Sequence, residues 1–144
     1  MDAPSLQRLA EGARACGLDL TERQLQIFDR YHGLLVQWNR RINLTRITAP
    51  GEVVDRHFLD SLALGPHLRP GTNLLDIGSG AGFPGAVLAV ARQDLAVTLC
   101  ESVRKKAAFL RELALELGLA VEGEVEHIAG AERELLLPLG ALRG

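Results

Sequence analysis

A glycine-rich segment, Asp76-Ile77-Gly78-Ser79-Gly80-Ala81-Gly82-Phe83-Pro84-Gly85, has the residue types that best suit ligand chemistry. It follows a short apolar run and precedes a run of small residues, which predicts a loop between a buried strand and a helix. Glycines in such a loop allow the backbone to approach a ligand without a Cβ in the way. We expect their amide groups to form an anion-binding concavity at the carboxyl edge of a sheet.

Two classes of cofactor and one ligand-free interpretation compete for this loop. Residues 80–85 spell G-x-G-x-x-G, which is also the dinucleotide fingerprint. Asp76, however, precedes the first glycine, where a carboxylate faces an ammonium group well but repels a pyrophosphate. Pro84 also removes an amide from the first helical turn, where phosphate would bind. The loop therefore favours S-adenosylmethionine over a dinucleotide, and a tight turn without a ligand is the third interpretation.

Glu101 adds a second acidic group to this candidate site. It ends the next predicted strand, about 20 residues beyond the loop, where an acid accepts hydrogen bonds from a ribose diol. Both cofactor classes carry such a diol, so Glu101 supports a nucleotide-like ligand without separating the two. We therefore place Asp76, Glu101 and the loop glycines Gly78, Gly80 and Gly82 in the cofactor site.

The elements that position the loop follow from apolar periodicity and from helix caps. Helices are expected at residues 4–16, from an N-cap at Thr21 through Trp38, and at 52–64, 84–92 and 104–117. Strands are expected at 73–77, 96–100 and 121–128. This order predicts an α/β fold in which a helical cap, residues 1–68, precedes a parallel sheet, residues 69–144.

Composition excludes several classes of protein. The 144 residues carry a net charge of −2 and are 47% hydrophobic, which is ordinary for a globular domain. The apolar runs are too short to span a bilayer, and no export signal precedes them, so we expect a cytoplasmic protein without a membrane anchor. Cys16 and Cys100 are expected to be reduced, and the histidines show no metal-ligand spacing, so no metal is expected.

Several blocks resemble the bacterial small-subunit (16S) ribosomal RNA guanine-N7 methyltransferases, also called glucose-inhibited division protein B. The matching blocks are Trp38-Asn39 with Ile42-Asn43-Leu44-Thr45, Arg56-His57-Phe58-Leu59-Asp60-Ser61-Leu62, the loop at 76–85, and Glu101-Ser102 with Arg104-Lys105-Lys106. They cover the chain from about residue 20 to 118. The resemblance implies a Rossmann-like class I methyltransferase fold and methyl transfer from S-adenosylmethionine to N7 of one guanine.

The resemblance also assigns residues. It implies that Gly78 and Phe83 line the cofactor, that Glu101 holds the ribose, and that Ala131 and Glu132 meet the adenine. Asn39, Asn43, His57 and Asp60 are cleft-mouth candidates, and the block at Asp60 is equally open to a structural role that pins the cap to the loop. Guanine N7 attacks through a free lone pair and loses no proton, so no general base is expected; orientation supplies the catalysis.

A basic set of side chains is the candidate RNA surface. Its members are Arg40, Arg41, Arg46, Arg56, Lys105 and Lys106. Phosphate contacts of this kind position a protein without reading sequence, whereas a solvated charged face is the alternative for each residue. The implied partner is small-subunit ribosomal RNA or the 30S subunit. The full-length family is expected to be monomeric, and the oligomeric state of this chain stays open.

The chain differs from the family at its end, because family members continue for about 60 further residues. The C-terminal strands of the sheet are therefore expected to be missing, which leaves the strand at 73–77 as an apolar edge. We expect a truncated or frameshifted product that binds cofactor weakly and transfers little or no methyl group. A dinucleotide-dependent oxidoreductase and a non-catalytic binding module remain the alternative functions.

Overall fold

The amino-terminal part of the chain is helical. The computed structural model describes the backbone of residues 1–126 and 133–137 and the side chains of residues 1–121. The helical segments are α1 (Ala3–Ala15), α2 (Glu22–Asn39), α3 (Pro50–Val53), η1 (Val54–Leu59), α4 (Asp60–Leu62) and η2 (Gly65–His67). The remaining elements are β1 (Asn73–Ile77), α5 (Gly85–Ala91), β2 (Ala96–Glu101), α6 (Arg104–Leu117), β3 (Val121–Glu126) and β4 (Arg133–Leu137).

Helix α2 begins at the predicted capping box. The Thr21 side chain accepts a hydrogen bond from the Gln24 amide at 3.1 Å, and the Gln24 side chain accepts one from the Thr21 amide at 2.8 Å. Both bonds satisfy amides that have no partner within the helix, so the start of α2 is determined locally. Its buried face carries Phe28, Tyr31 and Leu35, as the apolar spacing predicts.

The predicted helix at 52–64 is instead a continuous helical stretch of three parts. It begins two residues earlier, at Pro50, and ends at Leu62, and its middle part, η1, is a π-helix. A π turn closes its hydrogen bonds one residue farther along the chain than an α turn, so it changes the direction of the side chains that follow. Residue periodicity does not reveal this change, and η1 carries His57.

The α/β order of the sheet confirms the predicted fold class. Strands β1, β2 and β3 are parallel, with Asn73 opposite Ala96 and Val97 opposite Val121. Among the described residues β4 completes a four-stranded sheet by pairing antiparallel with β3, which the sequence analysis did not predict. The third strand ends at Glu126, and the last two residues of its predicted range lie outside the described part of the chain.

Strand β1 is an exposed apolar edge, as expected. Within the described residues it pairs only with β2, and the relative exposures of Leu75 and Ile77 are 57% and 73%. The opposite side of the strand packs under α5, where Asp76 is buried. Large apolar side chains are rarely this exposed in groups, so the face of β1 that carries Leu75 and Ile77 is uncovered among the described residues.

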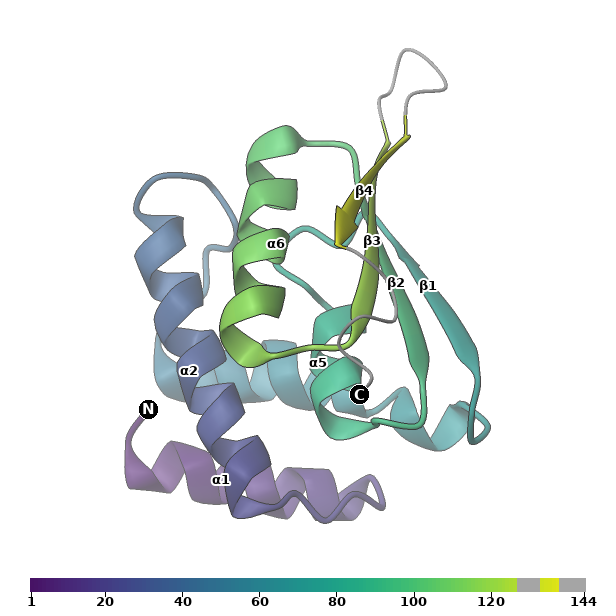
Figure 1. Cartoon of the computed structure of the whole chain (residues 1–144). Helices are drawn as coiled ribbons and strands as arrows, with labels where there is room; N and C mark the ends of the chain where they lie inside the picture. Colours follow the sequence, from purple (N-terminus) through teal and green to yellow (C-terminus); the bar gives the residue numbers. More distant parts are fainter. Residues whose placement is uncertain (127–132, 138–144) are drawn as a thin grey trace.

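One hydrophobic core connects the cap to the sheet. It includes Phe28 and Phe58 from the cap as well as Leu99 and Phe109 from the sheet layer. Figure 1 shows α2 lying against α6, with α1 and the helical stretch at 50–62 across the lower part of the molecule. The predicted domain boundary at residue 68 stays a prediction. No helix in the described ranges has the length and apolar character needed to cross a membrane.

Candidate cofactor site

The glycine loop joins the carboxyl end of β1 to α5, as predicted, but its amides are mostly used within the protein. The amides of Gly78 and Ser79 donate to the Cys100 carbonyl at 2.8 and 3.0 Å, because Cys100 is next to the last residue of the neighbouring parallel strand. Gly82 donates to the Ser79 carbonyl at 2.7 Å. The amides of Gly80 and Gly85 also have acceptors, described below. The expectation that these amides are open to an anion is therefore wrong for these five, because each already has an acceptor within the protein.

Asp76 lies beneath the loop and anchors its far end. Its Oδ2 atom accepts a hydrogen bond from the Gly85 amide at 2.9 Å, and its residue is only 7% exposed. Burial raises the pKa of Asp76, and the nearby Glu101 charge raises this pKa further, against the opposing effect of the Gly85 hydrogen bond. The Asp76 carboxylate therefore holds the loop in place, in addition to any contact with a ligand above the loop.

Glu101 anchors the middle of the loop from β2. Its Oε1 atom accepts from the Gly80 amide at 2.8 Å, and its Oε2 atom accepts from the Val103 amide at 2.8 Å. An ionised carboxylate has about four acceptor positions, so each oxygen retains one for a further donor such as a ribose hydroxyl. Two buried carboxylates thus lie at the carboxyl edge of the sheet, directly under the glycine backbone.

Gly78 presents bare backbone at the start of the same loop. Its φ is +75°, and a Cβ built there would meet no atom within 4 Å. The surface over Gly78 is therefore open, and only a glycine side chain leaves it flat. This geometry fits a ligand that approaches the backbone closely and carries positive charge or hydroxyl donors.

Replacement of Asp76 by Asn should change the pH dependence of stability. Because the pKa is raised in the folded state, the folded protein binds this proton more tightly than the unfolded chain, so wild-type stability falls as pH rises above the ordinary value of 3.8. Asn keeps an acceptor for Gly85 but cannot ionise. We expect the free energy of unfolding of Asp76→Asn, relative to wild type, to increase between pH 4 and pH 7, by at most about 1.4 kcal/mol per pH unit. Urea denaturation across this range measures it, and a constant or shrinking difference would contradict the assignment.

An aromatic cluster holds the end of the loop against the cap. The Phe83 ring is stacked on Tyr31 with centroids 5.8 Å apart and on His57 with centroids 4.3 Å apart. The Tyr31 hydroxyl donates to the Ala81 carbonyl at 2.6 Å. Sequence analysis placed Tyr31 only in the core; the signal for its second role is that a buried tyrosine hydroxyl needs a partner. Burial and the Asp76 charge raise the pKa of Tyr31 well above its ordinary value.

The cleft-mouth candidates separate into different environments. Asn39 and His57 are half-buried and make internal hydrogen bonds, whereas Asn43 and Asp60 are exposed. Asp60 lies with Phe83 and Pro84 on an open pocket of about 460 Å³, which also contacts His67. The structure therefore brings both Asp60 and His57 to the loop. Asp60 lies at an open surface, and His57 lies inside the cap. Ala131 and Glu132 lie outside the described residues.

The basic residues lie at the same end of the molecule as the glycine loop. Trp38 near the end of α2 meets Phe109 of α6 edge-on at 5.8 Å, and Arg30 pairs with Glu116 farther along the two helices. Helices α2 and α6 are therefore antiparallel, and the loop after α2 lies beside the start of α6 (Figure 1). This arrangement brings the basic residues onto neighbouring elements. Arg40, Arg41 and Arg46 are on the loop after α2, Arg56 is in η1, and Lys105 and Lys106 are in α6.

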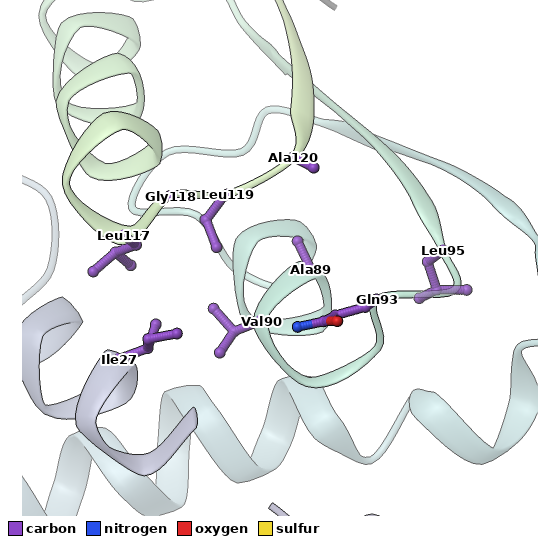
Figure 2. Close-up of a pocket in the computed structure, with 9 residues that line it drawn as sticks. All are labelled: Ile27, Ala89, Val90, Gln93, Leu95, Leu117, Gly118, Leu119 and Ala120. Carbon is purple, nitrogen blue, oxygen red and sulfur yellow. The ribbon is translucent and has the colours of Figure 1, made fainter. Parts of the chain in front are cut away.

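A second cavity lies at the opposite edge of the sheet and has a volume of about 320 Å³. Figure 2 shows its lining residues, which come from α2, α5, α6 and the segments that follow α5 and α6. Its lining is Ile27, Ala89, Val90, Gln93, Leu95, Leu117, Gly118, Leu119 and Ala120. Leu95 precedes β2 and Ala120 precedes β3, so the cavity is at the amino ends of the strands. Ligands of open α/β sheets bind at the carboxyl ends, so this cavity is not the cofactor site.

Comparisons with known proteins agree with the resemblance. A family model described as "GidB: rRNA small subunit methyltransferase G" matches residues 24–135. A ribosomal RNA small subunit methyltransferase G from Anaeromyxobacter dehalogenans (strain 2CP-1) is 47% identical over 135 residues, 93% of this chain and 63% of the relative. The protein of the same name from Chromobacterium violaceum is 50% identical over 111 residues, 77% of this chain and 53% of the relative. The chain thus spans between about half and two thirds of these relatives.

Proposed function

Because the chain belongs to the GidB family of small-subunit ribosomal RNA methyltransferases, we propose that its glycine loop binds S-adenosylmethionine for methyl transfer to N7 of a guanine in that RNA. The observation that carries this proposal is the pair of buried carboxylates, Asp76 and Glu101, which hold a glycine loop whose backbone is open at Gly78. The reaction would take place in the cytoplasm, where small-subunit RNA or the 30S subunit is the partner.

The charge of the site supports this cofactor over a dinucleotide. Two carboxyl groups, Asp76 and Glu101, lie under the loop, and the pKa of Asp76 is raised by burial and, to a smaller extent, by the negative charge of Glu101. A pyrophosphate would add to this charge, whereas the ammonium and sulfonium groups of S-adenosylmethionine would offset it. The free acceptor positions of Glu101 would hold the ribose hydroxyls, and Phe83 would border the methionine end.

The chemistry requires orientation rather than proton transfer. The bound cofactor would supply an electrophilic methyl group, and guanine N7 has a lone pair that attacks it without losing a proton. The chain's own residues would hold the two reactants in line, an effect that reaches on the order of 7–11 kcal/mol in favourable cases. The open pocket beside Phe83 and Asp60 is the surface from which a base would approach.

The basic residues are proposed to hold the RNA backbone. Arg40, Arg41, Arg46 and Arg56 are exposed, as is Lys105, and they lie at the same end as the loop. Such contacts fix the orientation of an RNA without reading its sequence, and folded RNA is recognised largely by shape and by splayed bases. Binding would therefore weaken steeply as the salt concentration rises.

The test of the cofactor assignment compares two ligands. S-adenosylhomocysteine should raise the melting temperature of the chain and NAD should not, because a ligand stabilises the state that binds it. A shift with NAD alone, or with neither ligand, would overturn the assignment. For the transfer step, any tritiated methyl that this chain transfers from S-adenosylmethionine to small-subunit RNA should appear as 7-methylguanine and in small amount, in line with the little or no transfer expected above; label in another base would refute the guanine N7 assignment.

A further inference from the structure

His57 contacts the end of the glycine loop through its ring. The imidazole lies against the Phe83 ring with centroids 4.3 Å apart and planes 13° from parallel. Phe83 is the first residue after the last of three loop glycines with positive φ, at Gly78, Gly80 and Gly82. Because the glycines have no side chains, Phe83 is the large side chain through which the cap contacts this loop.

The other contacts of His57 point back into the cap. Its Nε2 atom lies 2.8 Å from the Thr45 hydroxyl, which in turn accepts from the Ile47 amide at 3.1 Å. The Asn39 side chain accepts from the amides of Leu44 and Thr45 at 3.0 Å each. The segment after α2 is thus held at Thr45, and Thr45 holds the imidazole that packs on Phe83.

These contacts leave His57 poorly suited to proton transfer and well suited to holding a neighbour. One nitrogen is occupied by Thr45 and one ring face is against Phe83. Burial lowers the pKa of His57, although the hydrogen bond with the Arg56 backbone and the Asp60 charge both raise this pKa. The lowered pKa favours the neutral ring. A neutral imidazole stacks on an aromatic ring without bringing a charge into the cap.

We propose that His57 is a positioning residue, which holds Phe83 and thereby keeps the glycine loop in the conformation that accepts the cofactor. The inference rests on the proposed function, since it concerns the affinity of the same site. The inference also connects two of the basic residues to the cofactor site, because Arg46 follows Thr45 in the chain and Arg56 precedes His57.

The test measures the affinity for S-adenosylhomocysteine by calorimetry in three variants of the chain. His57→Ala removes the stack and should weaken binding about threefold to tenfold, as expected from the energy of an aromatic pair. His57→Phe restores a ring without the Thr45 hydrogen bond and should return the affinity to within about twofold of wild type. His32→Ala is the matched control: His32 also bonds the segment after α2, through the Thr48 carbonyl at 2.8 Å, but has no ring contact with Phe83.

The outcomes separate this inference from the proposed function. Loss of affinity in His57→Ala, with rescue in His57→Phe and none of the loss in His32→Ala, supports it. The inference is overturned, while the cofactor assignment stands, if His57→Ala binds S-adenosylhomocysteine as tightly as wild type does. It is also overturned if His57→Phe binds as weakly as His57→Ala. Failure of the wild-type chain to bind S-adenosylhomocysteine would overturn both. Melting temperatures of all variants identify any loss that comes from unfolding.

Discussion

Replacement of Gly82 by Ala should destabilise the protein by about 2–5 kcal/mol, the sum of a backbone cost and a steric cost. Gly82 has a φ of +96°, which L-residues rarely adopt. A Cβ there would lie 2.2 Å from the Tyr31 hydroxyl and 2.9 Å from the Ala86 Cβ. Tyr31 is fully buried and cannot move aside without breaking its bond to Ala81. Urea denaturation of variant and wild type measures the loss.

A double-mutant cycle with Tyr31→Phe separates the two costs. Alone, Tyr31→Phe should cost about 1 kcal/mol, because it removes the hydrogen bond to the Ala81 carbonyl. In the Gly82→Ala background the same change removes the clashing oxygen, so it should cost less or should stabilise the protein. Neighbouring sites that share a contact are expected to be non-additive in this way. Strictly additive effects would show that the loop relaxes away from α2.

Local signals were sufficient to predict most elements of the fold. The Thr21 capping box, the apolar run at 73–77 and the loop between β1 and α5 each depend on neighbouring residues, and each lies where the sequence analysis placed it. The edge position of β1 was predicted from the resemblance rather than from a local pattern, and in the described sheet β1 is the outer strand.

The contacts that shape the site depend on tertiary structure and were not predictable. No local pattern shows that the Cys100 carbonyl takes two loop amides, or that the Tyr31 hydroxyl reaches Ala81, because these partners are 21 or more residues apart. The π turn at 54–59 shifts its hydrogen bonds by one residue without a compositional signal. His57 lies in that turn and stacks on Phe83, a contact that residue spacing does not predict, so the sequence indicates candidate residues but not their contacts.

Replacement of Gly78 by Ala should abolish most cofactor binding while leaving the fold nearly intact. Its φ of +75° makes Ala cost about 1 kcal/mol of stability, and no atom lies within 4 Å of the new methyl group. That methyl group would occupy the open surface at Gly78, where the proposed cofactor approaches the backbone. The affinity for S-adenosylhomocysteine should therefore fall at least about tenfold, since close approach to a ligand is what only glycine permits.

Gly71 provides a matched control at the other end of the same strand. Its φ is +76°, and a Cβ there also meets no atom within 4 Å. Gly71→Ala should therefore lower the melting temperature as much as Gly78→Ala does and leave the affinity unchanged. The comparison removes backbone strain from the argument, because both variants carry the same strain. Equal affinities in the two variants would show that the ligand does not lie over Gly78. Asp76 and Glu101 would then serve only to hold the loop.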